Sequence, residues 1–272
     1  MTDNYQAFMA SQTEQSNQNQ STSSNNAKPR FHRIMLKVGG ESLIGKREYG
    51  IDPEACLNVA QQIKGVFETG VQVAVVIGGG NIFRGLSAAK NGLDRATADY
   101  MGMLATVMNG LALKDALEQQ GVPTRVQSSL DMPAVAERFI RGKAISHLEK
   151  GRVLILTAGT GNPYVTTDTG AALHALELKC DVLMKATKVD GIYDKDPVSN
   201  PGAKRFRTLS YQDAINSPDI TIMDTSSLAM GSENNMPLMV FQLFEQDNLM
   251  RAVRGEDVGT YVSNDVKSEF AS

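Results

Sequence analysis

Cysteine and histidine are scarce in this 272-residue sequence, with two and three residues respectively. Two thiols, Cys56 and Cys180, are too few for a disulfide framework or for a zinc site built on cysteine. Both lie in stretches with a helical pattern, where we expect them to be small buried apolar residues. None of the three histidines lies in the loops that carry the functional motifs described below. Acid–base chemistry through imidazole is therefore not expected.

A large excess of charge and long apolar runs are also lacking. The 27 basic and 30 acidic side chains give a formal net charge of −3, which does not indicate binding to nucleic acid. No apolar run approaches the roughly 20 residues that cross a bilayer. The N-terminus has no basic start followed by an apolar segment, as a signal peptide would. We therefore expect a soluble cytoplasmic protein with no nucleic-acid and no membrane partner.

Several motifs of common enzyme classes are missing. There is no G-x-x-x-x-G-K-[ST], which excludes a P-loop kinase, and no G-x-G-x-x-G opens a helix, which disfavours a dinucleotide enzyme. There is no G-x-S-x-G nucleophile elbow and no Cys/His cluster. Phosphoryl transfer remains compatible with this inventory, because it depends on positioning and charge neutralisation more than on a protein base.

The N-terminal segment differs in composition from the rest of the chain. Residues 11–26 are all Ser, Thr, Gln or Asn except Glu14. Such a segment buries too little apolar area to offset the entropy of ordering it. We expect a disordered leader over residues 1–30 and a single folded domain over residues 31–272.

From Phe31 onwards, strand patterns alternate with helix patterns. Residues 33–38 form a short apolar run that ends at two glycines, and residues 71–77 are nearly all apolar, as in a strand covered on both faces. Asp52 and Pro53 read as the N-cap and first residue of a helix. Further strands are expected at 153–157, 182–186 and 238–243, and further helices at 97–120 and 168–179. This alternation predicts an α/β fold with a largely parallel central sheet, in which ligands bind beyond the carboxyl ends of the strands.

Four loops that follow expected strands carry groups suited to phosphate: residues 37–42, 78–85, 159–168 and 185–197. Glycines let backbone N–H groups approach an anion, and Arg84 offers a guanidinium that binds phosphate bidentately. The third loop leads into a helix N-terminus, which attracts anions. Each loop also has a simpler reading: a glycine turn, a surface lysine, a helix cap at Asp168 or a turn at Asp196. Together, they predict a phosphate site.

These loops and residues 101–106 resemble the bacterial uridylate kinases of the amino acid kinase superfamily over residues 31–262. Two runs are specific: 157–163 followed by Thr166, Thr167 and Asp168, and 185–191. The resemblance implies a three-layer α/β/α sandwich with a mostly parallel central sheet of about eight strands, of the amino acid kinase or carbamate kinase-like type. It also implies a homohexamer, with an acceptor-binding N-terminal part and an ATP-binding C-terminal part.

The resemblance implies a role for individual residues as well. Lys37 and Lys185 correspond to the lysines that neutralise the phosphoryl group in transfer, and Asp168 to the carboxylate that holds them. The residues implied to bind ATP are Lys37, Val38, Gly39, Gly40, Gly80 and Arg84 around the phosphates, and Thr187, Tyr193 and Asp196 at the nucleoside. Those implied to bind UMP are Gly79, Asp99, Thr160, Gly161, Asn162, Pro163, Tyr164, Val165, Thr166 and Thr167. Asp224 matches another acidic position of the family, whose role the sequence does not give.

The implied reaction transfers the γ-phosphoryl group of ATP to UMP, giving UDP and ADP in pyrimidine nucleotide biosynthesis. Mg²⁺ would be held mainly by ATP phosphates and water, so we name no protein ligand. UTP is the implied inhibitor. GTP is the implied activator, at a segment formed by Gly45, Lys46, Arg47, Glu48, Tyr49 and Gly50. Glu118 stands where some relatives carry a basic or imidazole group near that effector, while Lys114 and Arg125 keep positive charge nearby. Gly39 stands where the family usually has serine, and the backbone donors there remain.

Two alternatives stay open. A sibling kinase acting on a carboxylate or carbamate, such as aspartate, glutamate or acetylglutamate, would use similar phosphate machinery. Asp99 together with residues 160–167 favours UMP. A nucleotide sensor that binds UTP or GTP would not need to keep Lys37, Lys185 and Asp168.

Overall fold

The computed structural model describes residues 28–220 and 222–271. Most of the expected disordered leader, residues 1–27, lies outside the described residues. Arg30, at its end, donates its backbone N–H to the carbonyl of Val253 at 3.0 Å. Within the described ranges, no helix combines the length and apolar character that spanning a membrane requires.

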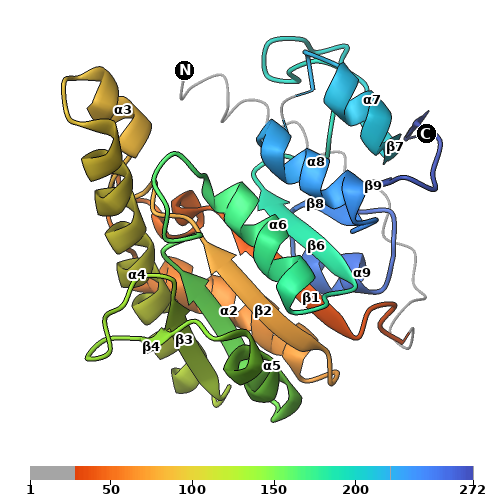
Figure 1. The fold of residues 1–272 in the computed structure, drawn as a ribbon. Coiled ribbons are helices and arrows are strands. Elements are labelled where there is room, and N and C mark those ends of the chain that lie inside the picture. Colours follow the sequence, from red (N-terminus) through yellow and green to blue (C-terminus); the bar gives the residue numbers. More distant parts are fainter. Residues whose placement is uncertain (1–27, 221, 272) are drawn as a thin grey trace.

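A ten-stranded sheet runs through the molecule in the order β10-β7-β9-β8-β6-β1-β2-β5-β3-β4 (Figure 1). The strands are β1 (Arg33–Val38), β2 (Gln72–Ile77), β3 (Thr124–Ser128), β4 (Glu137–Arg138), β5 (Val153–Thr157), β6 (Val182–Thr187), β7 (Phe206–Ser210), β8 (Leu238–Gln242), β9 (Gly259–Ser263) and β10 (Glu269–Phe270). The pairs β8–β9 and β10–β7 are antiparallel, and all pairings from β8 through β6 to β4 are parallel. The predicted, mostly parallel sheet is confirmed. It exceeds the expected eight strands because β4 and β10 are two-residue edge strands, too short to leave an apolar pattern.

The helices are η1 (Gly40–Leu43), α2 (Pro53–Phe67), α3 (Gly85–Lys90), α4 (Arg95–Gln119), α5 (Arg141–Glu149), α6 (Thr167–Glu177), α7 (Tyr211–Asn216), α8 (Thr225–Glu233) and α9 (Asn248–Val253). Side chains of β1 alternate between two cores, as successive residues of a strand must. Ile34, Leu36 and Val38 pack with residues of α2, α4 and α9. Met35 packs on the opposite face with residues of α5, α6 and α8. The sheet is therefore covered on both faces, and the predicted three-layer arrangement is confirmed.

Local sequence explains where the helices begin. Asp52 caps α2 by accepting the N–H of Glu54 at 3.2 Å, with Pro53 as the first helical residue, as predicted. Asp94 caps α4 by accepting the N–H of Thr97 at 2.9 Å, so this helix begins two residues before the predicted start. Cys56 lies buried in α2.

The predicted placement of Cys180 in a helix is wrong. The helix α6 ends at Glu177, and Lys179 then takes a left-handed φ of 54°, which helical backbone does not allow. Cys180 is buried, as expected, but in the connection between α6 and β6.

The four loops with phosphate-binding character follow β1, β2, β5 and β6. These strands are neighbours in the sheet, in the order β6-β1-β2-β5, and all three pairings among them are parallel. Parallel neighbours end at the same edge of a sheet, where crevices for ligands form. The fold therefore brings the four loops to one edge.

Candidate active site

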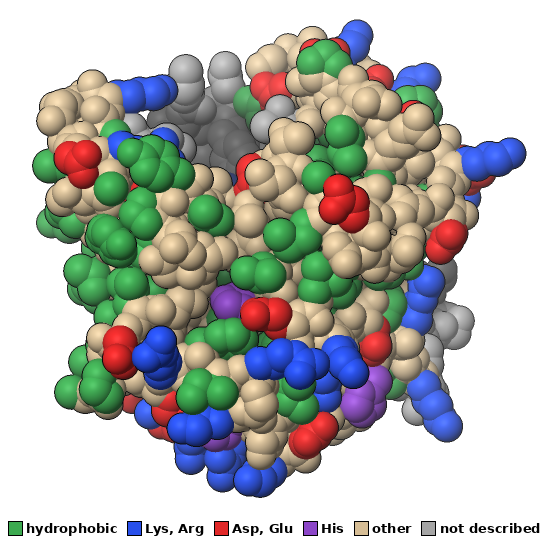
Figure 2. Space-filling model, in the orientation of Figure 1, with side chains coloured by type: hydrophobic (Ala, Val, Ile, Leu, Met, Phe, Trp, Pro, Cys, Tyr) green, Lys and Arg blue, Asp and Glu red, His purple; other side chains and the backbone are tan. Residues whose placement is uncertain are grey.

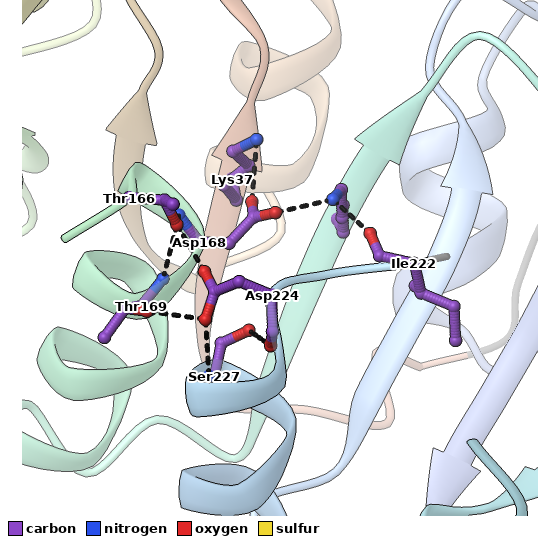
Figure 3. Close-up of polar contacts among 8 residues, drawn as sticks. Lys37, Thr166, Asp168, Thr169, Ile222, Asp224 and Ser227 are labelled. Atoms are coloured by element: carbon purple, nitrogen blue, oxygen red, sulfur yellow. Dashed lines mark hydrogen bonds and ion pairs between the residues drawn. The ribbon is translucent and has the colours of Figure 1, made fainter. Parts of the chain in front are cut away.

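Asp168 lies between two lysines at this edge of the sheet. The Nζ atoms of Lys37 and Lys185 are each 2.8 Å from a carboxylate oxygen of Asp168, Oδ1 and Oδ2 respectively (Figure 3). The Lys37 contact is an ion pair without hydrogen-bond alignment at Oδ1. Lys185 also donates to the backbone carbonyl of Ile222. The predicted trio of Lys37, Lys185 and Asp168 is thus brought together.

The register of the strands explains why the two lysines converge. Lys37 of β1 is paired with Lys185 of β6, and paired residues of parallel strands project from the same face. Lys37 lies two residues after Met35, which packs on the α6 side of the sheet, so its side chain points to that face. Asp168, in the first turn of α6, meets both lysines there.

Burial and charge oppose each other in this trio, in which each side chain is 12–15% exposed. Burial favours the neutral form of Asp168, but the ammonium groups of Lys37 and Lys185 outweigh it and hold the pKa of that carboxyl below its ordinary value. Burial lowers the pKa of Lys185, and Asp168 restores only part of the loss. Asp168 is therefore an ionised orienting group, with both oxygens engaged.

The structure gives Asp224 a place that the sequence could not. Its carboxylate caps α8 by accepting the N–H of Ser227 at 2.8 Å. It also accepts the hydroxyl groups of Thr166 and Thr169, the latter at 2.7 Å (Figure 3). Burial alone would raise the pKa of Asp224, but the hydrogen bonds from the two hydroxyl groups outweigh this effect and hold the pKa below its usual range. Asp224 thus ties the start of α8 to the start of α6, where Asp168 lies.

A second charged group lies where the loops after β1, β2 and β6 meet. Glu41 accepts from Arg84 and forms an ion pair with Lys188 at 2.9 Å. The hydrogen bond from Lys188 is the main reason that the pKa of Glu41 is lowered. Arg84, expected at the ATP phosphates, is exposed here. Its guanidinium and the Lys188 ammonium thus place two positive charges on one carboxylate where these loops meet.

Glycines allow the first two loops to approach one another. A Cβ on Gly40 would lie 2.3 Å from Oδ1 of Asn81, and one on Gly79 would lie 2.7 Å from the carbonyl of Gly102 in α4. A larger residue at Gly40 would push the two loops apart, and one at Gly79 would push the second loop away from α4. Val38, Gly39 and Gly80 lie in or beside these same loops, so the expected phosphate lining is brought together.

The residues expected at the ATP nucleoside line a separate cavity of about 320 Å³. Thr187, Tyr193 and Asp196 lie on its wall together with Val189, Gly191 and Ile222. Burial raises the pKa of Tyr193, whose hydroxyl donates to Asp190 at 2.7 Å. The side chain of Asp196 accepts from Val198 N–H and from the Ser199 hydroxyl, so it also shapes the turn that follows. Because Lys185 and Thr187 belong to the same strand, this cavity opens beside the lysine trio.

Among the residues expected to bind UMP, Asp99 connects α4 to the loop of residues 159–167. Its Oδ2 accepts the backbone N–H of Tyr164 at 2.7 Å and pairs with Arg95 at 2.8 Å. The Arg95 guanidinium lies 5.2 Å from the centre of the exposed Tyr164 ring. Asp99 is therefore brought to the loop formed by Thr160, Gly161, Asn162, Pro163, Tyr164, Val165, Thr166 and Thr167, as predicted.

The segment expected to respond to GTP, residues 45–50, lies between η1 and α2. Gly50 donates its N–H to the carbonyl of Asn81, and the Asn81 side chain donates back to the carbonyl of Gly50, both at 2.8 Å. The segment thus contacts the loop after β2 directly. Glu118 pairs with Lys114 at 3.7 Å and with Arg125 at 4.0 Å, so the nearby basic groups already have an acidic partner.

No cluster of three or more His, Cys, Asp or Glu side chains suited to a metal ion occurs in residues 28–220 and 222–271. Three further groups at the site carry no sequence motif. The carbonyl of Ile222 accepts from Lys185, and the side chains of Ser129 and His174 contact the loop after β5. A backbone carbonyl leaves no side-chain signal. Ser129 and His174 lie outside the four loops, and only the folded chain brings them there.

Comparisons with known proteins place this fold in a known family. Residues 32–242 match the model of the amino acid kinase family. A crystal structure of UMP kinase from Bacillus anthracis superposes with a TM-score of 0.85 at 35% identity, covering 89% of this chain and 99% of that one. UMP kinase from Ureaplasma parvum gives a TM-score of 0.81 at 35% identity, with coverage of 86% and 99%. Uridylate kinase from Archaeoglobus fulgidus gives 0.65 at 29%, with 85% and 99%. The chain therefore belongs to the amino acid kinase family, as its motifs predicted.

Proposed function

We propose that this protein is a UMP kinase, which transfers the γ-phosphoryl group of ATP to UMP and releases UDP and ADP. The observation that carries the proposal is the Asp168 carboxylate with Lys37 and Lys185 on its two oxygens. Two ammonium groups fixed at one point are suited to the charge that spreads over a phosphoryl group in transfer.

The mechanism is direct in-line displacement. An oxygen of the UMP phosphate attacks the γ-phosphorus of ATP, the bond to the β,γ-bridging oxygen breaks, and ADP leaves. A phosphate monoester oxygen is already deprotonated, so no general base is needed. Lys37, Lys185 and backbone N–H groups of the glycine loops neutralise the transferred group. Asp168 orients the lysines, since both of its oxygens are engaged.

UMP is favoured over a carboxylate or carbamate acceptor by two observations. Two UMP kinases match this chain at 35% identity over nearly their whole length. Asp99 lies at the loop of residues 160–167, bonded to Tyr164, where a carboxylate is suited to a ribose hydroxyl.

Mg²⁺ is the proposed metal, bound with ATP. The site offers ammonium, guanidinium and backbone N–H donors, which suit phosphate oxygens. Both Asp168 oxygens contact lysines. Magnesium commonly binds through substrate phosphates and water, and these donors fit such an arrangement. The bound ion would supply further neutralisation of phosphate charge.

We also propose that UTP inhibits and GTP activates. UTP carries the uridine and α-phosphate that the acceptor residues recognise, so it would compete with UMP. Gly50, the last residue of this segment, is hydrogen-bonded to Asn81, which gives a ligand at residues 45–50 a short route to the loop after β2. Free thiols and ATP-dependent nucleotide synthesis accord with a cytoplasmic enzyme of pyrimidine biosynthesis.

We also propose that the protein is a homohexamer and that its copies meet through an exposed apolar face on α4. Met101, Leu104, Met108 and Leu111 are 36–54% exposed and recur at helical spacing. Figure 2 shows apolar side chains gathered along the left edge of the molecule, where α4 lies. Exposed apolar stripes of this kind mark interfaces, so α4 is the face we assign to contact between copies.

A coupled assay of ADP release tests the function. It offers UMP, CMP, aspartate, glutamate and acetylglutamate as acceptors, each with and without GTP or UTP. We expect UMP to be the best acceptor, UTP to inhibit and GTP to activate. A better acceptor than UMP would establish the sibling reaction instead. Saturable UTP binding without UMP-dependent ADP release would establish a sensor.

A further inference from the structure

The turn that ends β5 is held by three side chains from other parts of the fold. Ala158 and Gly159 both take left-handed backbone conformations, with φ of 64° and 53°, and an alanine rarely adopts such values. The Thr106 hydroxyl accepts the N–H of Ala158 at 2.7 Å. The carbonyl of Gly159 accepts from the Ser129 hydroxyl at 2.7 Å and contacts Nε2 of His174 at 3.1 Å.

His174 is built into this position. It lies on α6, is 3% exposed, and packs against the Phe139 ring with centroids 4.5 Å apart. Its Nδ1 is 2.7 Å from a carboxylate oxygen of Glu177 on the same helix. A carbonyl oxygen only accepts, so Nε2 carries the hydrogen that meets Gly159. The Glu177 carboxylate likewise only accepts, so it fixes the orientation of the ring through a hydrogen on Nδ1.

The direction of the Gly159 carbonyl determines the direction of the next N–H. The peptide bonds of the described residues are trans, and a trans peptide points its C=O and N–H groups to opposite sides. A carbonyl drawn inwards by Ser129 and His174 therefore turns the N–H of Thr160 away from them. No protein acceptor for that N–H occurs in the described part of the chain. The group is left for a ligand.

We infer that His174 is a positioning residue for the acceptor phosphate. Its Nε2–H, with the Ser129 hydroxyl, holds the Gly159 carbonyl inwards so that the Thr160 N–H faces the phosphate of UMP. This inference rests on the proposed UMP site at residues 160–167. It assigns His174 no contact with substrate and no proton transfer.

The competing explanation is that His174 only fills space beside Phe139. Two substitutions separate these roles. His174→Phe keeps an aromatic ring against Phe139 but has no donor for Gly159. His174→Gln loses the ring, but its amide nitrogen reaches the place of Nε2 and restores the donor. If His174 only fills space, the Phe variant should bind UMP more tightly than the Gln variant. If His174 positions the loop, the Gln variant should bind UMP more tightly than the Phe variant.

The experiment measures the KM of UMP, the KM of ATP and kcat, together with the Kd of UMP by calorimetry without ATP. For His174→Phe we expect the KM and Kd of UMP to rise about tenfold, the effect of one lost hydrogen bond to a part-buried carbonyl. The KM of ATP and kcat should stay within about twofold. His174→Gln should return the KM of UMP to within about threefold of the wild type. His32→Gln, the same change at an exposed histidine, should alter nothing.

An unchanged UMP affinity in folded His174→Phe overturns the inference, as does a larger defect in His174→Gln than in His174→Phe. If His174→Phe fails to fold, His174→Asn takes its place, because its shorter amide reaches Glu177 but not Gly159. Equal UMP affinity of the Asn and Gln variants then overturns the inference. Failure of the proposed function is a separate result: the wild type itself would neither bind UMP nor release ADP in its presence.

Discussion

Lys37 and Lys185 are register partners on the adjacent parallel strands β1 and β6, and their ammonium groups contact the two oxygens of one carboxylate. Two ammonium groups that contact one carboxylate repel each other, and the negative charge of Asp168 offsets this repulsion before any ligand is bound. The ammonium groups are therefore preorganised, which is what electrostatic stabilisation of a transition state requires.

Removing either component of this arrangement should slow the chemical step. For Lys37→Ala and Asp168→Asn we expect kcat to fall about 100- to 1,000-fold, the usual effect of losing one preorganised charge contact, in a folded protein. Steady-state kinetics and circular dichroism measure the two properties. Lys150→Ala, at an exposed lysine after α5, is the matched control and should keep its kcat. Near-normal turnover in either site variant contradicts its role.

The pH dependence of the reaction should report the buried state of Lys185. Burial lowers the pKa of Lys185, and Asp168 raises it only in part. Transfer needs the ammonium form, which is present below this pKa and is lost as pH rises through it. The alkaline fall of kcat/KM for ATP, which reports the free enzyme, should therefore begin below the ordinary lysine value of 10.5.

Asp168→Asn provides the internal check on this assignment. The substitution removes the charge that raises the pKa of Lys185, so the alkaline fall should move to lower pH still. A pH–rate profile from 7 to 11 on both proteins measures the shift. An alkaline fall that stays in place in Asp168→Asn would mean that another group titrates.

Asp224→Asn should disturb the start of α6 without removing any group from the lysine trio. An amide offers one acceptor oxygen where the carboxylate serves Thr166, Thr169 and Ser227. We expect kcat to fall about tenfold and the free energy of unfolding to fall by about 1.5–3 kcal/mol, the range for a lost hydrogen bond to a charged group. Asp213→Asn changes a carboxylate in the first turn of α7 that accepts from the hydroxyls of Ser210 and Ser268, and it should lower stability alone. An unchanged kcat in Asp224→Asn would contradict the role of Asp224 in positioning the start of α6.

Chelation should separate a substrate-bound metal from a structural one. With EDTA in excess we expect ADP release to stop and to return when Mg²⁺ is restored. The melting temperature of the ATP-free protein should not change, because the described residues contain no side-chain cluster for a metal. A lower melting temperature in EDTA would reveal a metal bound by the protein itself.

The sequence predicted the parts of this fold that depend on local chemistry. Apolar runs marked β1, β2 and β5, and the Asp52–Pro53 pair marked the start of α2. Glycine, lysine and threonine after these strands marked the site, because parallel strands that are neighbours end at one edge. The motif resemblance then assigned Lys37, Lys185 and Asp168 before their contacts were visible.

Contacts between segments that are distant along the chain could not be predicted from the sequence. The sequence left Asp224 without a role, because its hydrogen bonds to Thr166 and Thr169 exist only once α8 packs on α6. The Ile222 carbonyl that receives Lys185 has no side-chain signature. His174 lies outside the four loops that carry motifs. Its contact with Gly159 forms because α6 packs against the loop that precedes it.

The exposed face of α4 leads to the last prediction. Leu104 and Met108 are 50% and 54% exposed, one helical turn apart, on the face assigned to contact between copies. Leu104→Glu places a charge in that contact, so it should convert the wild-type assembly into smaller species in light scattering after size exclusion. Ile215→Glu introduces the same charge at a residue of α7, away from α4, with 39% exposure and should leave the mass unchanged. A monomeric wild type at micromolar concentration, or an unchanged mass in Leu104→Glu, would show that α4 does not join copies of this chain.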